Sequence, residues 1–351
     1  VGGTRLWVDG TLLVNGTQVS PVVFTSLDTV SPARGDWVGI YVTASSTGTV
    51  IDHAQIRWAT RGVEVTGATT ATVSNSDIRE FSSYGVDYEA GAGGLISGNT
   101  IDNVDDVGQG IRLHNTVAVT VDANVVSNTQ HGVVVAGSSS PVVVSGNTLQ
   151  DNSNGIHVSG TADPQVTGNT IINNGYGVRV DAVYSNATPA PVVTGNDIYG
   201  NTSYDYYAER FGTAVNETIT LDATGNWWGT TDPLAIAVAI YDFRDNGTYS
   251  PFVDYSGFLA GSGGSVVPGN QLAGVLGTNT TLAAGTTTTV LGTVRVPAGV
   301  TLTLEAGAQL QFVGGTRLWV DGTLLVNGTQ VSPVVFTSLD TVSPARGDWV
   351  G

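Results

Sequence analysis

The sequence predicts an all-β fold, a three-sided parallel β-helix, from a short repeat that recurs along the chain. A Gly followed by a β-branched residue, a variable residue and an apolar residue returns every 22 to 25 residues, at Gly39, Gly62, Gly85, Gly110, Gly132, Gly155 and Gly177. Each interval holds two further short apolar segments, separated by Gly and Asn. A period of this length is typical of a solenoid, in which each turn of the chain buries its apolar face against the next.

The first strand of each turn, or rung, is the segment that follows the repeated Gly. Successive side chains of a strand alternate between its two faces, so the β-branched residue points inward and the variable residue points outward. The predicted inward column is Ile40, Val63, Val86, Ile111, Val133, Ile156 and Val178. The predicted outward column is Tyr41, Glu64, Asp87, Arg112, Val134, His157 and Arg179.

The second and third strands of each rung lie on either side of an Asn, as in Val144 before Asn147 and Leu149 after it. Asn tolerates the left-handed backbone conformation, and stacked amides can bond from rung to rung. We therefore expect a ladder at the corner between these strands, formed by Asn75, Asn99, Asn124, Asn147, Asn169 and Asn196.

A leucine-rich repeat is the alternative fold, because it shares this period and an Asn. Such repeats need a Leu-rich consensus and usually a helical segment. Here the inward positions are Val and Ile, and the intervals between strands hold Gly, Ser, Thr and Asn. The composition favours the β-helix.

A much longer repeat also runs through the chain, since residues 1–39 are identical to residues 313–351. We expect the chain to be one 312-residue period of a longer array, followed by the start of the next period. Fibres, stalks and adhesins use such repetition, whereas an enzyme seldom needs it. This repeat predicts a structural function and contacts between one block and the next.

The composition excludes several classes of partner. The formal net charge of −17 argues against binding to nucleic acid or to an anionic membrane surface. No segment is apolar for the roughly 18 residues that membrane insertion requires. Cys, Met and Lys are all absent, which excludes thiol chemistry and favours an extracellular or cell-surface location.

Two motifs resemble those of a known class of proteins. The segment from Thr293 to Phe312, continued by residues 318–324, resembles the opening rungs of right-handed β-helix repeats in large secreted bacterial and archaeal surface proteins. Residues 225–229, Gly-Asn-Trp-Trp-Gly, resemble the motif that closes such helices, including the NosD-like group. The resemblance implies a right-handed helix of the pectate-lyase-like superfamily, which contains enzymes, adhesins and structural proteins alike.

These motifs divide the chain into three expected parts. Residues 1–260 would form the rungs and closing region of one block, residues 261–274 a linker rich in Gly and Ser, and residues 275–351 the opening rungs of the next block. A Gly/Ser-rich segment favours a flexible tether on composition alone.

Enzymatic activity is an alternative with two candidate sites. Asp105, Asp106, His131 and Arg179 faintly resemble elements of polygalacturonases, whose inverting hydrolysis needs two carboxyl groups about 6.5–9.5 Å apart. Glu64, Asp87 and Arg112 share one outward column and would suit a lyase that binds Ca²⁺ and removes a proton with a base. Mixed charges on an exposed sheet face are more often structural, so we assign no catalytic residue.

Binding sites for other ligands are equally open. Carboxylates that could bind Ca²⁺, the only cofactor considered, are Asp242, Asp245 and Asp254. Aromatic residues that could contact a glycan or a partner are Tyr204, Tyr206, Tyr207 and Trp228, although Trp228 is more simply explained as an end cap. Glycosylation sequons occur at Asn15, Asn186, Asn201, Asn216, Asn246, Asn279 and Asn327.

The sequence therefore predicts a non-catalytic repeat of an extracellular fibre or stalk, whose partner is another copy of itself. A glycan-binding adhesin module is the first alternative, and a polysaccharide lyase or hydrolase is the second.

Overall fold

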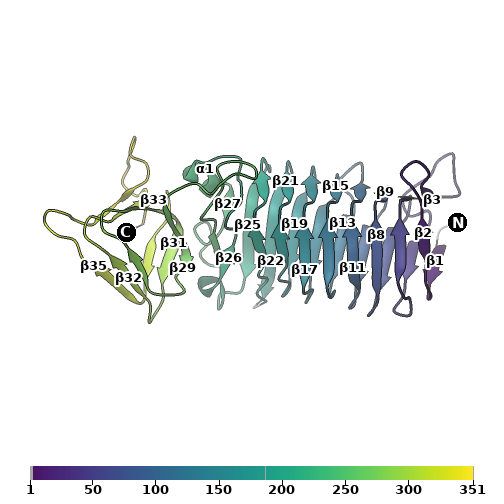
Figure 1. Ribbon diagram of the computed structural model, residues 1–351, viewed down its shortest axis with the longest axis horizontal. Coiled ribbons are helices and arrows are strands. Elements are labelled where there is room, and N and C mark those ends of the chain that lie inside the picture. The colour runs from purple at the N-terminus through teal and green to yellow at the C-terminus, as the bar shows by residue number, and fades with distance from the viewer. Residues whose placement is uncertain (1–2, 186, 351) are drawn as a thin grey trace. The chain divides into compact units, whose positions relative to one another are not determined.

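The computed structural model describes residues 3–185 and 187–350, and these form a parallel β-solenoid of about 13 turns with three main sheets and almost no helix. The predicted fold class is therefore confirmed. The chain divides into two compact units, one containing residues 1–183 and 187–206 and the other containing residues 184–186 and 207–351. Figure 1 shows the strands of successive rungs side by side, from β1 onward.

The first sheet of the first unit contains the strands that follow the repeated Gly, and all pair in parallel. In spatial order they are β1 (Arg5–Val8), β4 (Gly39–Val42), β7 (Arg61–Thr66), β10 (Tyr84–Glu89), β13 (Gln109–His114), β16 (His131–Ala136), β19 (Asn154–Ser159) and β22 (Tyr176–Ser185). The register joins equivalent residues, such as Val86 with Val63 on one side and with Ile111 on the other. The predicted inward column is thereby stacked in register, and all seven of its residues are completely buried.

The other two sheets are built from the segments before and after the corner Asn. The second sheet contains β2 (Leu13–Asn15), β5 (Thr49–Asp52), β8 (Thr70–Ser74), β11 (Gly93–Ser97), β14 (Val119–Asp122), β17 (Val142–Ser145), β20 (Gln165–Thr167) and β23 (Val192–Thr194). The third contains β3 (Val22–Phe24), β6 (Ala54–Arg57), β9 (Asp77–Arg79), β12 (Thr100–Asp102), β15 (Val125–Ser127), β18 (Thr148–Gln150), β21 (Thr170–Ile172) and β24 (Asp197–Tyr199). Three strands per rung enclose one apolar core.

The corner between the second and third sheets contains the predicted Asn ladder. The side-chain amide of Asn99 donates to Asn124 at 2.9 Å, and the same bond joins Asn124 to Asn147, Asn147 to Asn169 and Asn169 to Asn196. Asn75 was wrongly included in the ladder. It is exposed and has φ of +49°, so it occupies the left-handed position of Gly98, and Ser76 stands where the other rungs have Asn.

A second ladder lies at the corner after the third sheet, and we did not predict it. Asn152 donates to Asn174 at 3.1 Å, and Asn174 donates to Asn201 at 3.0 Å. Thr129 extends this ladder by donating to Asn152 through both its amide and its hydroxyl. The polar groups at two corners of the solenoid are thus bonded from rung to rung.

The second unit begins within β25 (Tyr204–Phe211) and contains two groups of elements. The first group comprises the 3₁₀ helix η1 (Asn216–Thr218), β26 (Thr220–Asp222), α1 (Pro233–Val238), β27 (Ile240–Tyr241) and β28 (Phe252–Asp254). Helix α1 starts where Asp232 caps it by accepting a hydrogen bond from the Leu234 amide at 3.0 Å. Among the described residues, no helix is long and apolar enough to cross a membrane.

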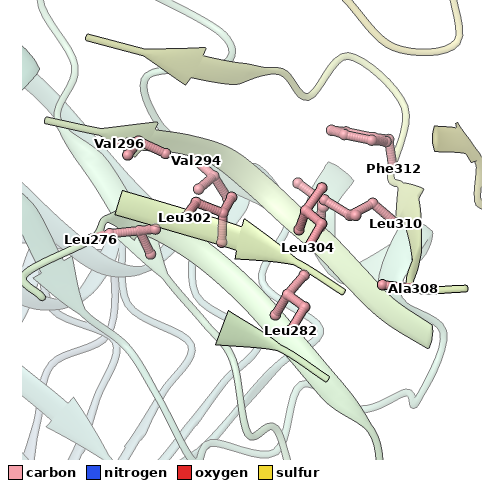
Figure 2. Close-up of a cluster of buried hydrophobic side chains, with 10 residues drawn as sticks. Leu276, Leu282, Val294, Val296, Leu302, Leu304, Ala308, Leu310 and Phe312 are labelled. Carbon is pink, nitrogen blue, oxygen red and sulfur yellow. The ribbon is translucent and has the colours of Figure 1, made fainter. Parts of the chain in front are cut away.

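The second group of elements in this unit forms new rungs. One sheet contains β29 (Asn270–Val275), β31 (Thr287–Val296), β33 (Gln309–Phe312), β34 (Leu318–Val320) and β36 (Val335–Ser338), and the other contains β30 (Thr280–Leu282), β32 (Thr301–Leu304) and β35 (Thr323–Val326). Figure 2 shows their core, in which Val294, Leu302, Leu304 and Leu310 are completely buried. These strands lie between Asn270 and Ser338.

The predicted linker, residues 261–274, is more ordered than its composition indicates. Its start is a turn closed by the bond from the Ala260 amide to the Ser265 carbonyl at 2.9 Å. Leu259 and Val266 form an antiparallel bridge beside that turn. Strand β29 begins at Asn270, so about a third of the predicted linker belongs to a sheet.

Candidate functional site

The outer face of the first sheet carries a group of charged and aromatic side chains on the first unit. Its central column is the predicted outward column that contains Glu64, Asp87 and Arg112. A neighbouring column, three residues earlier in each rung, contributes Arg61, Tyr84 and residues of the following rungs. Because rungs are only about 4.8 Å apart, side chains in these columns contact one another.

A cluster of three carboxylates and two guanidinium groups occupies rungs β7, β10 and β13. Arg112 Nη1 donates to both oxygens of Asp87 at 2.9 Å and to Glu89 at 3.2 Å. Arg61 forms an ion pair with Glu64 and lies 3.9 Å from Asp87. The cluster therefore holds one more acid than base.

Asp87 is completely buried although it points away from the core. Tyr84 lies on the same strand, and the guanidinium groups of Arg61 and Arg112 are 5.3 and 4.9 Å from the centre of its ring. Burial raises the pKa of Asp87 to about 7, against the opposing effect of Arg112. Burial also raises the pKa of Glu64. Burial thus favours the neutral form of both carboxyl groups.

A pair of histidines lies farther along the same face. The rings of His131 and His157 have centres 5.1 Å apart, and the Nδ1 atom of His131 is 2.9 Å from the amide nitrogen of Asn154. Burial, with a smaller effect of Arg179, lowers the pKa of His131 to about 4. His131 is therefore neutral at physiological pH and can exchange hydrogen bonds without carrying charge.

Two buried acceptors beside the histidines have no hydrogen-bond partner among the described residues. They are Gln109 Oε1 and Asn154 Oδ1, on β13 and β19. A buried acceptor without a partner costs free energy, so it is ready to accept a bond from a ligand. The side chains of Gln109, His131 and Asn154 are adjacent in the register and form what we call the amide–histidine strip. It suits hydroxyl groups better than charged ones.

The polygalacturonase-like set predicted from the sequence is only partly assembled. Asp105 is 64% exposed and pairs with Arg34, which also binds Glu80 at 2.8 Å. Asp106 follows it in the same turn, with φ of +55°. His131 instead contacts Asn154 and His157 on neighbouring strands, with Arg179 near enough to affect its pKa. Among the described residues, neither Asp105 nor Asp106 forms a hydrogen bond or an ion pair with His131.

Of the four aromatic residues considered as glycan or partner contacts, Tyr206 and Trp228 do not reach the surface. Tyr206 is completely buried and Trp228 is 97% buried, because both side chains point into the core. Tyr204 and Tyr207 are half-buried: Tyr204 stacks on Tyr176 with ring centres 6.4 Å apart, and Tyr207 stacks on Tyr241 at 4.8 Å. The burial of Trp228 agrees with a capping role.

The candidate Ca²⁺ ligands do not gather into one site. Asp242 is buried, accepts a bond from the Arg244 amide at 2.9 Å and has its pKa raised to about 6 by burial. Asp245 lies beside it, but Asp254 lies on β28 and accepts from the Ser256 amide. The described residues contain no group of three or more His or carboxylate side chains arranged to hold a metal.

The sequons differ in accessibility. Asn15, Asn279 and Asn327 are exposed and Asn246 is half-buried. Asn216 is buried, and the amide of Asn201 is bonded within the second ladder to Ile171 and Asp205, so neither has room for a glycan on the folded protein. Asn186 lies outside the described residues.

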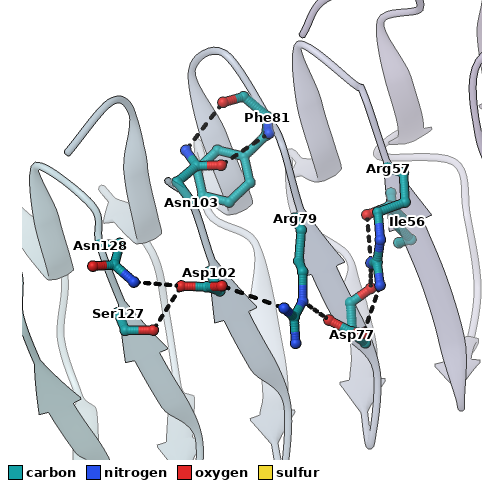
Figure 3. A network of polar contacts seen from close by, with 9 residues as sticks. All are labelled: Ile56, Arg57, Asp77, Arg79, Phe81, Asp102, Asn103, Ser127 and Asn128. Atoms are coloured by element: carbon teal, nitrogen blue, oxygen red, sulfur yellow. Dashed lines mark hydrogen bonds and ion pairs between the residues drawn. The ribbon is translucent and has the colours of Figure 1, made fainter. Parts of the chain in front are cut away.

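A further polar network, not predicted from the sequence, lies on the outer face of the third sheet (Figure 3). Arg57 and Arg79 both bind Asp77, Arg79 reaches Asp102 at 3.4 Å, and Asp102 accepts from Ser127 and Asn128 at 2.8 Å. Arg57, Arg79, Asp102 and Ser127 occupy equivalent positions on successive rungs, so the recurrence of polar residues at the end of each third strand was the signal that could have found it. It links four rungs and stabilises their stacking.

Comparisons with known proteins agree with this architecture. Residues 29–174 match the family described as right handed beta helix region, and residues 274–351 match pectate-lyase like beta helix domain. Among curated proteins, none matches the chain in sequence.

Several solved structures are similar to the chain at low identity. A mutant of the periplasmic alginate epimerase AlgG is 13% identical, with a TM-score of 0.41, over 93% of this chain and 77% of that one. The A-module of the Azotobacter vinelandii mannuronan C-5 epimerase AlgE4 is 14% identical, with a TM-score of 0.31, over 95% of this chain and 90% of that one. The chain is therefore a parallel β-solenoid whose residues 29–174 are similar to the right handed beta helix region family and whose residues 274–351 are similar to the pectate-lyase like beta helix domain.

Proposed function

We propose that the chain is a structural block of an extracellular fibre or stalk, in which β-helix blocks follow one another and no reaction is catalysed. The observation that carries this proposal is the behaviour of the repeated segment. In its first copy, β1, β2 and β3 pair with the following strands β4, β5 and β6. In its second copy, β34, β35 and β36 pair with the preceding strands β31, β32 and β33. The same rung can therefore be joined on either side.

The mechanical basis of this function is the bonding from rung to rung. Backbone hydrogen bonds, two side-chain ladders and the Arg–Asp network of Figure 3 all run between rungs. Such a solenoid is stabilised by the sum of its nearest-neighbour interfaces, so repeating the block extends the fibre without weakening it. The absence of Cys, Met and Lys supports an extracellular location. The proposed partner is another copy of the block, and no cofactor is required.

A tandem polypeptide tests this proposal. Residues 1–312 followed by residues 1–351 would contain the joint between two blocks. Electron microscopy should show one uninterrupted particle whose length increases by one block. Two separately closed globules joined by a flexible segment would contradict the proposal.

Glycan binding is a second candidate function, and the amide–histidine strip is the observation that favours it. Its two unpartnered buried acceptors suit the hydroxyl groups of a sugar. Binding on a glycan array should then be lost in Asn154→Ala and retained in the control Ser127→Ala, which lies on the third sheet. Retention of binding in both variants would exclude the strip.

A turnover assay addresses the lyase or hydrolase alternative. Turnover of a uronate polymer, with and without Ca²⁺, would have to disappear in His131→Ala for this face to be an active site. If the unmodified chain shows no turnover, the remaining alternatives are glycan binding and a purely structural role.

A further inference from the structure

We propose that a polar hollow at the corner between the second and third sheets binds an uncharged sugar. This corner hollow has a volume of about 480 Å³, within the range of roughly 300–1,000 Å³ that is typical of small-molecule sites. Residues of four successive rungs line it, among them Gln18, His53, Gln55, Asn75, Asp77 and Arg79. The corner hollow is separate from the amide–histidine strip, which lies on the first sheet.

One wall of the corner hollow is the loop between β2 and β3. This loop spans residues 16–21 and is longer than the equivalent turns of the next three rungs. It is closed by two backbone hydrogen bonds between Thr17 and Ser20, both 3.1 Å long. The same two bonds join Thr329 and Ser332 in the second copy, where the neighbouring rung lies on the other side. The shape of this wall is therefore a property of the loop itself.

Two side chains that line the corner hollow belong to residues with a left-handed backbone. In most rungs this position of the corner is Gly, which adopts positive φ without strain. His53 and Asn75 occupy it in the two rungs that follow the loop, with φ of +51° and +49°. A residue with a side chain costs free energy in this conformation, and such residues are often retained for function. Both side chains are therefore candidates for ligand contact.

The His53 ring is held by a carboxylate. Its Nδ1 atom is 2.7 Å from Oδ2 of Asp52, and Nδ1 carries a proton because a carboxylate only accepts hydrogen bonds. Asp52 in turn accepts from the Ser74 hydroxyl at 2.6 Å and from the Asn75 amide at 2.8 Å. In the neutral ring the other nitrogen, Nε2, is then an acceptor, and it has no hydrogen bond to the described residues. A sugar hydroxyl can donate to it.

Two amide side chains supply further hydrogen-bonding groups. Gln18 lines the corner hollow from the loop and Gln55 from β6, and neither side chain is hydrogen-bonded to a described residue. An amide both donates and accepts, as a hydroxyl does. Pro21 adds apolar surface on which the ring carbons of a sugar can pack. The backbone groups of β6 are paired with β3 and β9, so a peptide could not add to them as a strand.

The charged groups of the corner hollow are paired, which favours an uncharged ligand. Asp77 accepts from Arg57 and from Arg79, the latter at 2.7 Å, and Arg79 also reaches Asp102 at 3.4 Å (Figure 3). An anionic sugar would meet the carboxylate of Asp77 as well as the guanidinium group of Arg79. The attraction and the repulsion would largely cancel, whereas the hydroxyl groups of a neutral sugar can bond to either group.

Titration of the isotope-labelled full chain with methyl glycosides of glucose, galactose and mannose tests the proposal. The readout is the NMR signals of the Gln18 and Gln55 side-chain amides. At least one of these neutral glycosides should shift both signals, with weak affinity because a single ring forms few contacts. The methyl glycoside of glucuronic acid, which adds a carboxylate, should bind more weakly. Absence of shifts with every neutral glycoside, or tighter binding of the glucuronide, would overturn the proposal.

Two variants with matched controls assign the binding to these side chains. His53→Gly removes the imidazole but suits the left-handed backbone, so the fold should be kept. Its affinity should fall about three- to tenfold, as expected for one lost hydrogen bond, and Gln55→Ala should have a similar effect. The controls are Ala123→Gly, at the same corner position of a later rung, and Gln165→Ala, at an exposed position on β20. Neither control should change the affinity.

Unchanged affinity in both His53→Gly and Gln55→Ala would overturn the proposal. Asn154→Ala alters the amide–histidine strip and should leave the shifts of the Gln18 and Gln55 signals as they are. Loss of those shifts in Asn154→Ala would place the sugar on the strip and would also overturn the proposal. None of these outcomes affects the proposed structural function, because the tandem polypeptide tests that function without any sugar.

Discussion

The two copies of the repeated segment have one sequence but bury different residues. Val14 is buried in the first copy, whereas Val326 at the same place in the second copy is exposed. The reverse holds for Thr4, which is exposed, and Thr316, which is completely buried. The first copy has a neighbouring rung after it and the second has one before it. In a solenoid, the burial of a residue is thus decided by the adjacent rungs as well as by its own strand.

The largest expected contrast between the copies comes from a buried charge. Val14→Asp should lower the free energy of unfolding by about 3–5 kcal/mol, because it places an unpaired carboxylate in the core. Val326→Asp, the same change in the second copy, should cost less than about 1 kcal/mol because that side chain is partly in water. Denaturant unfolding of the two variants measures the difference. Equal effects would show that both copies are covered alike.

A residue outside the repeated segment should make the stability of the protein depend on pH. Asp87 lies outside that segment, and its pKa is about 7 in the folded protein and near 3.8 when unfolded. The folded state therefore binds an extra proton between these values, so its contribution to stability falls as the pH rises from about 4 to 7.

The variant Asp87→Asn isolates this effect from other titrating groups. Stability of the unmodified chain relative to Asp87→Asn should be greater at pH 5 than at pH 8, by roughly 1–3 kcal/mol. His131 acts in the opposite sense, since its pKa is lowered, but it is present in both chains. Thermal unfolding at several pH values measures the difference, and parallel curves would refute the raised pKa of Asp87.

A smaller contrast comes from the two equivalent threonines. The Thr316 hydroxyl donates to the Val313 carbonyl within the core of the second copy. Thr316→Ala should cost about 1 kcal/mol, since it removes that bond and leaves a buried carbonyl with one partner fewer. Thr4→Ala, at an exposed position, should change stability by less than about 0.5 kcal/mol. Local hydrogen exchange around each site distinguishes the two, and a larger effect at Thr4 would reverse the comparison.

Much of the fold followed from the sequence because its periodicity is strong. Gly at intervals of 22 to 25 residues marked the first strands from β4 to β22, and alternation assigned the inward column from Ile40 to Val178 correctly. The same alternation placed Asp87 outward but gave no sign that it is buried, since Arg61, Arg112 and Tyr84 come from three different rungs. Tyr206 was misjudged because aromatic residues in an irregular interval have no period from which to infer a face.

The sequence by itself determined the rung, its strands and its repetition, because each depends on local patterns of Gly, Asn and alternating apolar residues. Only the tertiary structure decided which charges are paired, which polar groups lack partners and which residues of each copy of the repeat are buried. Those properties depend on side chains 20 or more residues apart in sequence that stacking brings together. The repeated segment shows this most directly. Its two copies have the same sequence, but different residues are buried in each because the neighbouring rung lies on a different side.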